Sequence, residues 1–229
     1  NKHHPATRPV KSRDGKTLTN TEDQLKRWVA HFKTLLNQPP PESSIDIPPA
    51  ETPLNIDCNR PSRSEIKDAI KQMQNNKSPG PDNIPAESLK GDMTTSTEML
   101  YELLGKIWEE EELPNDRKEG HIIKIPKKGD RSQCDNYRGI MLLSAPGKVL
   151  NRVLLQRLRA TVDKKLRDHQ AGFRAERSCT DQIATLRIIL EQSREFDSPL
   201  YVVFVDFLKA FDSLDREALW KLMQHYGIP

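Results

Sequence analysis

The sequence is poor in the features that define several common protein classes. Its 3 cysteines in 229 residues, at Cys58, Cys134 and Cys179, are too far apart for a CxxC zinc pair or a disulfide framework. No run approaches the roughly 18 apolar residues of a membrane helix, and the first residues form no hydrophobic signal core. No glycine-rich phosphate-binding loop is present. We therefore expect reduced thiols, a cytoplasmic or nuclear location and no membrane partner.

Charge is abundant and unevenly distributed. Residues 115–187 contain 17 Lys and Arg against 8 Asp and Glu, a local excess of +9, whereas residues 1–114 and 188–229 each carry a net charge of −3. Such an excess suits a polyanion, because each neutralised phosphate of a nucleic acid releases condensed counterions. The alternative is a solvated basic face without a partner.

Proline content and helical periodicity divide the chain into segments. Residues 1–20 are interpreted as a polar tail, 21–38 as an amphipathic helix that begins with a Thr21–Gln24 capping box, and 39–61 as an extended proline-rich linker. A second capping box, formed by Ser62 and Glu65, begins the next helix. Further helices are expected through 99–108, from about Ala145, and after caps at Thr180 and Ser213.

Two segments are expected to form strands. Residues 121–125 are rich in β-branched side chains and lead into a basic turn at Lys127 and Lys128. Residues 200–205 form an unbroken apolar run, which predicts a strand buried on both faces and ending at Asp206. A carboxylate held at the end of a rigid strand is well placed to bind Mg²⁺, although Asp at this position is also common as a turn former or cap.

Four sequence strings together resemble one known family. Residues 205–212 (VDFLKAFD) resemble the first palm motif of reverse transcriptases, in particular those of non-LTR (LINE-like) retrotransposons. Three further strings match the same family in the expected order: 78–87 (SPGPDNIPAE), 125–130 with 136–140 (IPKKGD and NYRGI), and 170–174 with 177–182 (QAGFR and RSCTDQ). The resemblance covers roughly residues 62–229, so chance agreement is a poor explanation.

The resemblance implies a fold and an activity. The fold would be an α+β right-hand polymerase, mostly helical, with the fingers at 62–199 and the first palm strand and its following helix at 200–229, truncated before the palm is complete. The activity would be RNA-directed DNA polymerisation from dNTPs, with an RNA template, a DNA primer or target DNA, and two Mg²⁺ ions. A related intron-encoded enzyme is the closest alternative. A non-catalytic nucleic-acid-binding remnant of a decayed retroelement is the alternative from another class.

The resemblance also assigns roles to individual residues. Asp206 would be a catalytic residue and metal ligand, and Phe211 would lie against the nucleotide sugar. Contacts to the incoming triphosphate would come from Arg138, Lys127 and Lys128, with Lys124 as a further candidate. Arg174 and Arg177 would contact nucleic acid, or alternatively form salt bridges to Glu176 or Asp181. Because the family's second metal-binding pair, an Asp-Asp turn, does not occur in residues 1–229, we expect this chain alone to be inactive.

Overall fold

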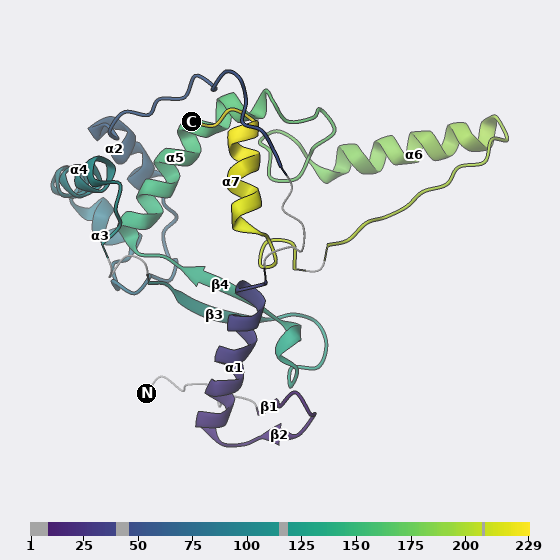
Figure 1. The fold of residues 1–229 in the computed structure, drawn as a ribbon, viewed down its shortest axis with the longest axis horizontal. Helices are drawn as coiled ribbons and strands as arrows, with labels where there is room; N and C mark the ends of the chain where they lie inside the picture. Colours follow the sequence, from purple (N-terminus) through teal and green to yellow (C-terminus); the bar gives the residue numbers. More distant parts are fainter. Residues whose placement is uncertain (1–8, 40–45, 115–118, 208) are drawn as a thin grey trace. The chain divides into compact units, whose positions relative to one another are not determined.

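A computed structural model describes residues 9–39, 46–114, 119–207 and 209–229. About 47% of the chain is helical, and two small sheets contain two strands each (Figure 1). The chain divides into two compact units, one of residues 1–44 and 58–155 and the other of residues 45–57 and 156–229. The architecture is therefore mixed α and β. Among the described residues, no helix is both long enough and apolar enough to cross a membrane.

Three helices form the main core of the first unit. Helix α2 (Arg63–Lys71), helix α4 (Met93–Glu110) and helix α5 (Ala145–Asp163) surround a cluster of fully or nearly buried apolar side chains, with the short α3 (Ala86–Gly91) beside them (Figure 1). The cluster contains Ile66, Ala69, Ile70, Leu100, Leu104, Ile107, Val149 and Val153. These residues recur at helical spacing, so each helix buries one face. The predicted Ser62–Glu65 capping box at the start of α2 is confirmed.

A second, smaller core joins helix α1 (Thr21–Leu36) to two hairpins. The first hairpin pairs β1 (Val10–Lys11) with β2 (Thr17–Leu18), and the second pairs β3 (His121–Pro126) with β4 (Tyr137–Leu142). Val10, Trp28 and Cys134 are buried together, with Cys134 in the short 3₁₀ helix η2 (Cys134–Asn136). Burial raises the pKa of the Cys134 thiol.

This core corrects two predictions. Residues 10–18 are not a polar tail, because Val10 is 1% exposed and the Lys11 amide donates to the Ser132 carbonyl. The α1 cap is Asn20, whose side chain accepts from the Glu22 amide, whereas Thr21 is already the first helical residue. Asn and Thr are both good cap residues. The spacing of apolar residues along the helix therefore did not show whether Asn20 or Thr21 is the cap.

The loop at residues 78–87 is seated against the start of α5. The Asp82 carboxylate accepts a 2.6 Å hydrogen bond from the Ala145 amide, one of the donors that a helix N-terminus leaves unsatisfied. Gly80 lies so close to the Leu143 carbonyl that a Cβ at this position would clash with its oxygen. Glu87 accepts a short hydrogen bond from the Asn76 amide, which lowers the pKa of Glu87. The SPGPD string therefore fixes the connection between β4 and α5.

The second unit consists of two helices and long connections. Helix α6 (Cys179–Glu195) begins at a capping box of Ser178 and Asp181, so the predicted cap at Thr180 is wrong by two residues. Helix α7 (Arg216–His225) is capped by Asp215 rather than by Ser213. Residues 46–57 form no helix or strand, yet the Ala50 and Leu54 amides donate to carbonyls at the end of α7. Within the described chain, no hydrophobic side chain of this unit is buried.

The strand predicted at residues 200–205 is absent. These residues have no regular secondary structure, and their apolar side chains are exposed, with Tyr201 at 90%, Val203 at 84% and Phe204 at 82%. A β-strand needs a neighbour for its backbone hydrogen bonds, and each described sheet already consists of its two paired strands. An apolar, β-branched segment favours a strand, but the described residues supply no neighbouring strand for it.

The contact between Asp82 and α5 predicts a measurable effect on stability. Asp82→Ala removes the acceptor for the Ala145 amide and is expected to lower the free energy of unfolding by about 1 kcal/mol. Asp82→Asn keeps an acceptor oxygen and is expected to cost less. Urea denaturation followed by circular dichroism compares the two variants with wild type. Equal midpoints for wild type and Asp82→Ala would show that this contact does not hold the loop.

Candidate functional site

The β3–β4 hairpin brings together three of the predicted nucleotide-binding residues. Arg138 is exposed on β4 opposite Ile125, and Lys127 and Lys128 follow directly after the end of β3. The Lys127 amide donates to the Asn136 carbonyl at 2.7 Å and so extends the ladder into the turn. The three cations therefore lie at the same end of one hairpin, on a backbone held by hydrogen bonds.

Asp130 organises the turn that carries the two lysines. Its carboxylate accepts from the amide and hydroxyl of Ser132 at 2.9 and 2.8 Å, which lowers the pKa of Asp130. The Asn136 side chain donates to the Asp130 carbonyl at 2.8 Å. Gly129 has a φ of +118°, a conformation that side chains disfavour. The structure thus explains the KKGD string: Gly129 and Asp130 shape the turn, and the two lysines before them stay exposed.

Lys124 faces a different environment from the hairpin tip. Its ammonium lies 4.5 Å from the centroid of the Trp28 ring of α1, and partial burial lowers the pKa of Lys124. Gly139, opposite Lys124, leaves room for the Phe32 ring of the same helix. The Lys124 side of the hairpin is therefore the side that packs on α1. This placement favours Lys127 and Lys128 over Lys124 as contacts for a bound phosphate.

Asp206 and Phe211 lie in the second unit, in residues without regular secondary structure. Asp206 is exposed and does not follow a strand, in contrast to the expectation. Phe211 is 77% exposed and meets the ring of Phe173 edge to face, with the centroids 5.4 Å apart. Asp215 accepts from the Ala218 amide as the α7 cap, so its carboxylate is already used.

The described residues do not form a magnesium site. No group of three or more His, Cys, Asp or Glu side chains among them could hold a metal ion. Asp206 alone supplies one carboxylate, whereas Mg²⁺ prefers an octahedral shell of oxygens and a two-ion centre needs several carboxylates. The donor set therefore does not fit two ions.

Arg174 and Arg177 belong to the same string but differ in their surroundings. The Arg174 guanidinium forms a bidentate pair with Asp163, at 2.8 Å from Nε and 3.1 Å from Nη2, and its Nη1 donates to the Arg167 carbonyl at 2.8 Å. Its side chain is 6% exposed. The hydrogen bond from Arg174 lowers the pKa of Asp163. Arg177 is exposed. A phosphate contact by Arg174 would require breaking this pair, so the geometry favours Arg177.

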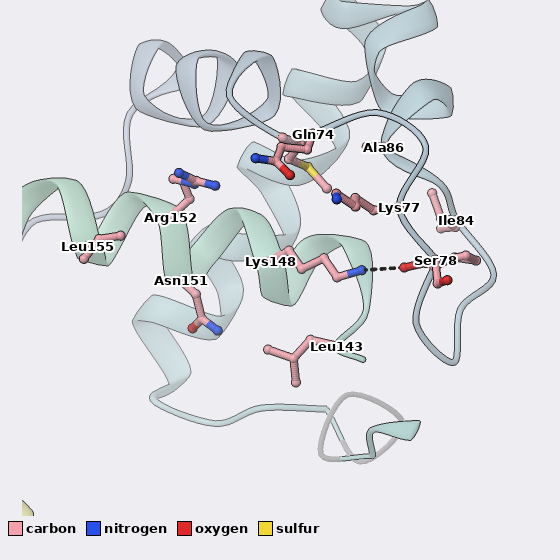
Figure 2. Close-up of a pocket in the computed structure, with 12 residues that line it drawn as sticks. Gln74, Lys77, Ser78, Ile84, Ala86, Leu143, Lys148, Asn151, Arg152 and Leu155 are labelled. Atoms are coloured by element: carbon pink, nitrogen blue, oxygen red, sulfur yellow. Dashed lines mark hydrogen bonds between the residues drawn. The ribbon is translucent and has the colours of Figure 1, made fainter. Parts of the chain in front are cut away.

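The structure also shows a pocket that sequence reasoning missed (Figure 2). It has a volume of about 500 Å³ and lies between the 73–86 segment and α5. Lys77, Lys148 and Arg152 contribute cations to its lining, and Lys148 Nζ donates to the Ser78 carbonyl at 3.2 Å. One sequence feature could have pointed to this pocket: Lys148 and Arg152 are four residues apart, which places both on one face of a helix. Lys77 could be added only once the loop was seen against that face.

Comparisons with known proteins agree with the resemblance. Residues 125–229 match the family model described as reverse transcriptase (RNA-dependent DNA polymerase). The chain is 29% identical over 222 residues to a probable RNA-directed DNA polymerase from transposon BS of Drosophila melanogaster, covering 92% of the chain and 24% of that protein. It is 24% identical over 225 residues to the Pol polyprotein of the retrotransposable element R2DM of the same species, covering 96% and 21%.

A further relative supports the same grouping. The RNA-directed DNA polymerase from mobile element jockey of Drosophila melanogaster is 27% identical over 153 residues, which cover 65% of the chain and 16% of the relative. The chain thus spans about a quarter or less of the length of these relatives. The matched family region includes the basic hairpin tip, Arg174, Arg177, Asp206 and Phe211.

The two arginines predict different responses to substitution. Arg174→Lys keeps the charge but loses the bidentate geometry, and is expected to speed hydrogen exchange in residues 163–174 a few-fold. Because the folded pKa of Asp163 is depressed, its contribution to stability is present above about pH 4 and is lost as pH falls through the folded pKa. Wild type should therefore begin to loosen below about pH 4 and should reach the same loosening only once the pH is below the depressed pKa of Asp163.

The control for this measurement is Arg177→Lys, which is expected to leave exchange in the loop unchanged. Hydrogen exchange detected by mass spectrometry reports both variants across pH. An Arg174→Lys chain with normal exchange but weakened RNA binding would show instead that Arg174 serves as a nucleic-acid contact.

Proposed function

The chain carries a partial reverse transcriptase domain related to the polymerases of non-LTR retrotransposons, and from this premise we propose that it forms part of an enzyme that copies RNA into DNA. The observation that carries the proposal is the family match over residues 125–229, which joins the basic hairpin and Asp206 in one stretch. Residues 62–199 would form the fingers and residues 200–229 the start of the palm. RNA template, DNA primer or target DNA, and dNTPs would be its substrates.

The hairpin tip is proposed to hold the triphosphate of the incoming dNTP. Arg138 offers a planar fork of donors that suits phosphate oxygens, and Lys127 and Lys128 add two compact positive charges at the same end. The hydrogen-bonded turn around Asp130 supports this role, because it holds the lysine backbone in place before a ligand arrives.

Asp206 is proposed as a metal ligand of the polymerase. The family uses Mg²⁺, and the metal ions would activate the primer hydroxyl and stabilise the leaving pyrophosphate. Since the described residues supply no complete ligand set, no catalytic step is assigned to this chain alone. Phe211 is proposed to lie against the nucleotide sugar. Its side chain is 77% exposed, so most of the ring is open to a ligand.

Nucleic-acid binding without catalysis is the second candidate function. It is favoured by the difference between the two units: the basic hairpin is held by a ladder and a core, whereas Asp206 follows exposed apolar residues without secondary structure. Binding needs only the charge excess of residues 115–187. Measurements of binding and of primer extension separate the two functions.

The binding component predicts a salt-dependent affinity for single-stranded RNA. For Z phosphate contacts the slope of log K against log salt should be about −0.7Z. Replacing Lys127, Lys128 and Arg138 by Gln should reduce the magnitude of this slope by about 2, because three phosphate contacts are removed. Fluorescence anisotropy titrations at several salt concentrations measure it. An affinity that does not change with salt would contradict the proposal.

The catalytic component is tested in a chimera. Residues 125–229 replace the matching segment of the jockey polymerase, and extension of a primer on RNA is measured with Mg²⁺. Asp206→Asn is expected to reduce extension by more than about a hundredfold, because it weakens a metal ligand. Asp215→Asn is the matched control, since Asn also caps a helix.

Two outcomes of the chimera experiment would contradict the proposal. One is a soluble chimera that binds template and primer but does not extend them. The other is an equal loss of extension in Asp206→Asn and Asp215→Asn, which would remove the special role of Asp206.

A further inference from the structure

An apolar groove lies between helix α1 and strand β3 of the first unit. Its volume of about 1060 Å³ is at the upper end of what small-molecule sites enclose, roughly 300–1,000 Å³. Apolar side chains of α1, among them Leu25 and Val29, line it together with Ile122, Ile123 and Lys124 of β3. Leu25 is 63% exposed and Val29 is 59% exposed. The groove therefore offers apolar surface that no described residue covers.

One side of this α1–β3 groove is the open edge of a sheet. Among the described strands, β3 pairs with β4 alone. Consecutive side chains of a strand point to opposite faces, so a groove that touches all of residues 122–124 lies at the edge that β4 leaves free.

The hydrogen bonds of the hairpin show which backbone groups face this edge. The Lys127 amide donates to the Asn136 carbonyl, and bonded and non-bonded positions alternate along an antiparallel pair. Ile122 and Lys124 are therefore at non-bonded positions and direct their N–H and C=O groups away from β4. These groups are available for pairing with another strand.

An extended peptide suits the groove better than a helix does. A peptide strand would pair with the free N–H and C=O groups of β3, and its alternate side chains would pack on the apolar wall of α1. A helix could cover the apolar wall, but its own backbone groups are bonded internally, so it would leave the edge of β3 unpaired.

The charge of the groove indicates what else the peptide carries. Lys33 and Lys124 line the groove, and no Asp or Glu does. Neither lysine forms an ion pair within the part of the chain that the structure describes. A carboxylate in the peptide would be attracted by both ammonium groups, whereas a basic residue would be repelled.

We propose that the α1–β3 groove binds an extended segment of a partner protein, which adds as a strand to β3, has apolar residues at alternate positions and carries an acidic residue. This site goes beyond the proposed polymerase function, because its ligand is a polypeptide and it uses neither Asp206 nor the β3–β4 hairpin tip.

The experiment uses the whole 229-residue chain and labelled synthetic peptides of about eight residues, within the usual length of a strand. The first peptide alternates valine with threonine and has glutamate at both ends. The second has lysine in place of glutamate. The third is the first peptide with N-methyl groups on its internal amides, which removes the backbone donors that a strand needs. Fluorescence anisotropy measures the binding of each.

Matched variants test where the peptide binds. The groove variant, Leu25→Ser with Lys33→Gln, removes an exposed apolar side chain and a positive charge from α1. The control variant, Met99→Ser with Lys106→Gln, makes the same kind of change at exposed positions of α4 in the same unit, where Met99 is 69% exposed. Circular dichroism checks that both variants are folded. If the groove variant is not, the three peptides on wild type decide.

The glutamate peptide is expected to bind wild type at least about fivefold more tightly than the lysine peptide or the N-methylated peptide. The groove variant should weaken binding of the glutamate peptide about five- to tenfold, because it loses an apolar contact and an attractive charge. The control variant should stay within about twofold of wild type.

Four results would overturn the proposal. The first is that wild type binds none of the peptides at low salt. The second is that the lysine or N-methylated peptide binds as tightly as the glutamate peptide, which excludes the acidic preference or the strand pairing. The third is an equal response of the groove and control variants.

The fourth is self-association in analytical ultracentrifugation that the groove variant abolishes and the control variant keeps, which would make a second copy of the chain the occupant. No step of the experiment requires polymerisation, so the groove can fail the test while the chimera remains active, and the converse also holds.

Discussion

The hydrogen bond from the Ala145 amide to Asp82 ties the 78–87 loop to the start of α5, where the helical core meets the β3–β4 hairpin. It satisfies a donor at the start of α5, and Gly80 brings the same loop against the Leu143 carbonyl. The loop thereby fixes the point where β4 gives way to α5. From there Val149 and Val153 enter the helical core, and the opposite side of the connection leads into the basic hairpin. The same loop forms one wall of the pocket beside α5.

The two units differ in how far the described residues stabilise them. The first has two clusters of buried apolar side chains and holds the hairpin cations on a paired backbone. The second leaves its apolar segment at residues 200–207 exposed, although hydrophobic burial is the main driving force of folding. In the proposed function, the hairpin cations would be presented to phosphate by a supported element. Among the described residues, by contrast, Asp206 follows no strand and has no partner carboxylates for a metal ion.

Arg174 and Arg177 show why a motif match does not assign a contact. Both belong to one string, and both carry a guanidinium that suits phosphate. Arg174 directs its fork at Asp163 and closes the loop between α5 and α6, which is a structural role. Asp163 lies 11 residues away in sequence, so neither salt bridge considered from the sequence, to Glu176 or to Asp181, identified the partner. Arg177 stays exposed within the same unit.

The sequence by itself indicated the resemblance to reverse transcriptases through its four strings. It also determined the positions of the main helices and the capping box at Ser62, because these depend on local spacing of apolar and cap residues. It also identified residues 121–125 as strand and Lys127 and Lys128 as an exposed turn. Only the tertiary structure decided that residues 10–18 pack on α1, that residues 200–205 form no strand, and that Lys77 joins Lys148 and Arg152 around one pocket. Each of these depends on a partner distant in sequence, and local propensity carries no information about whether that partner is in place.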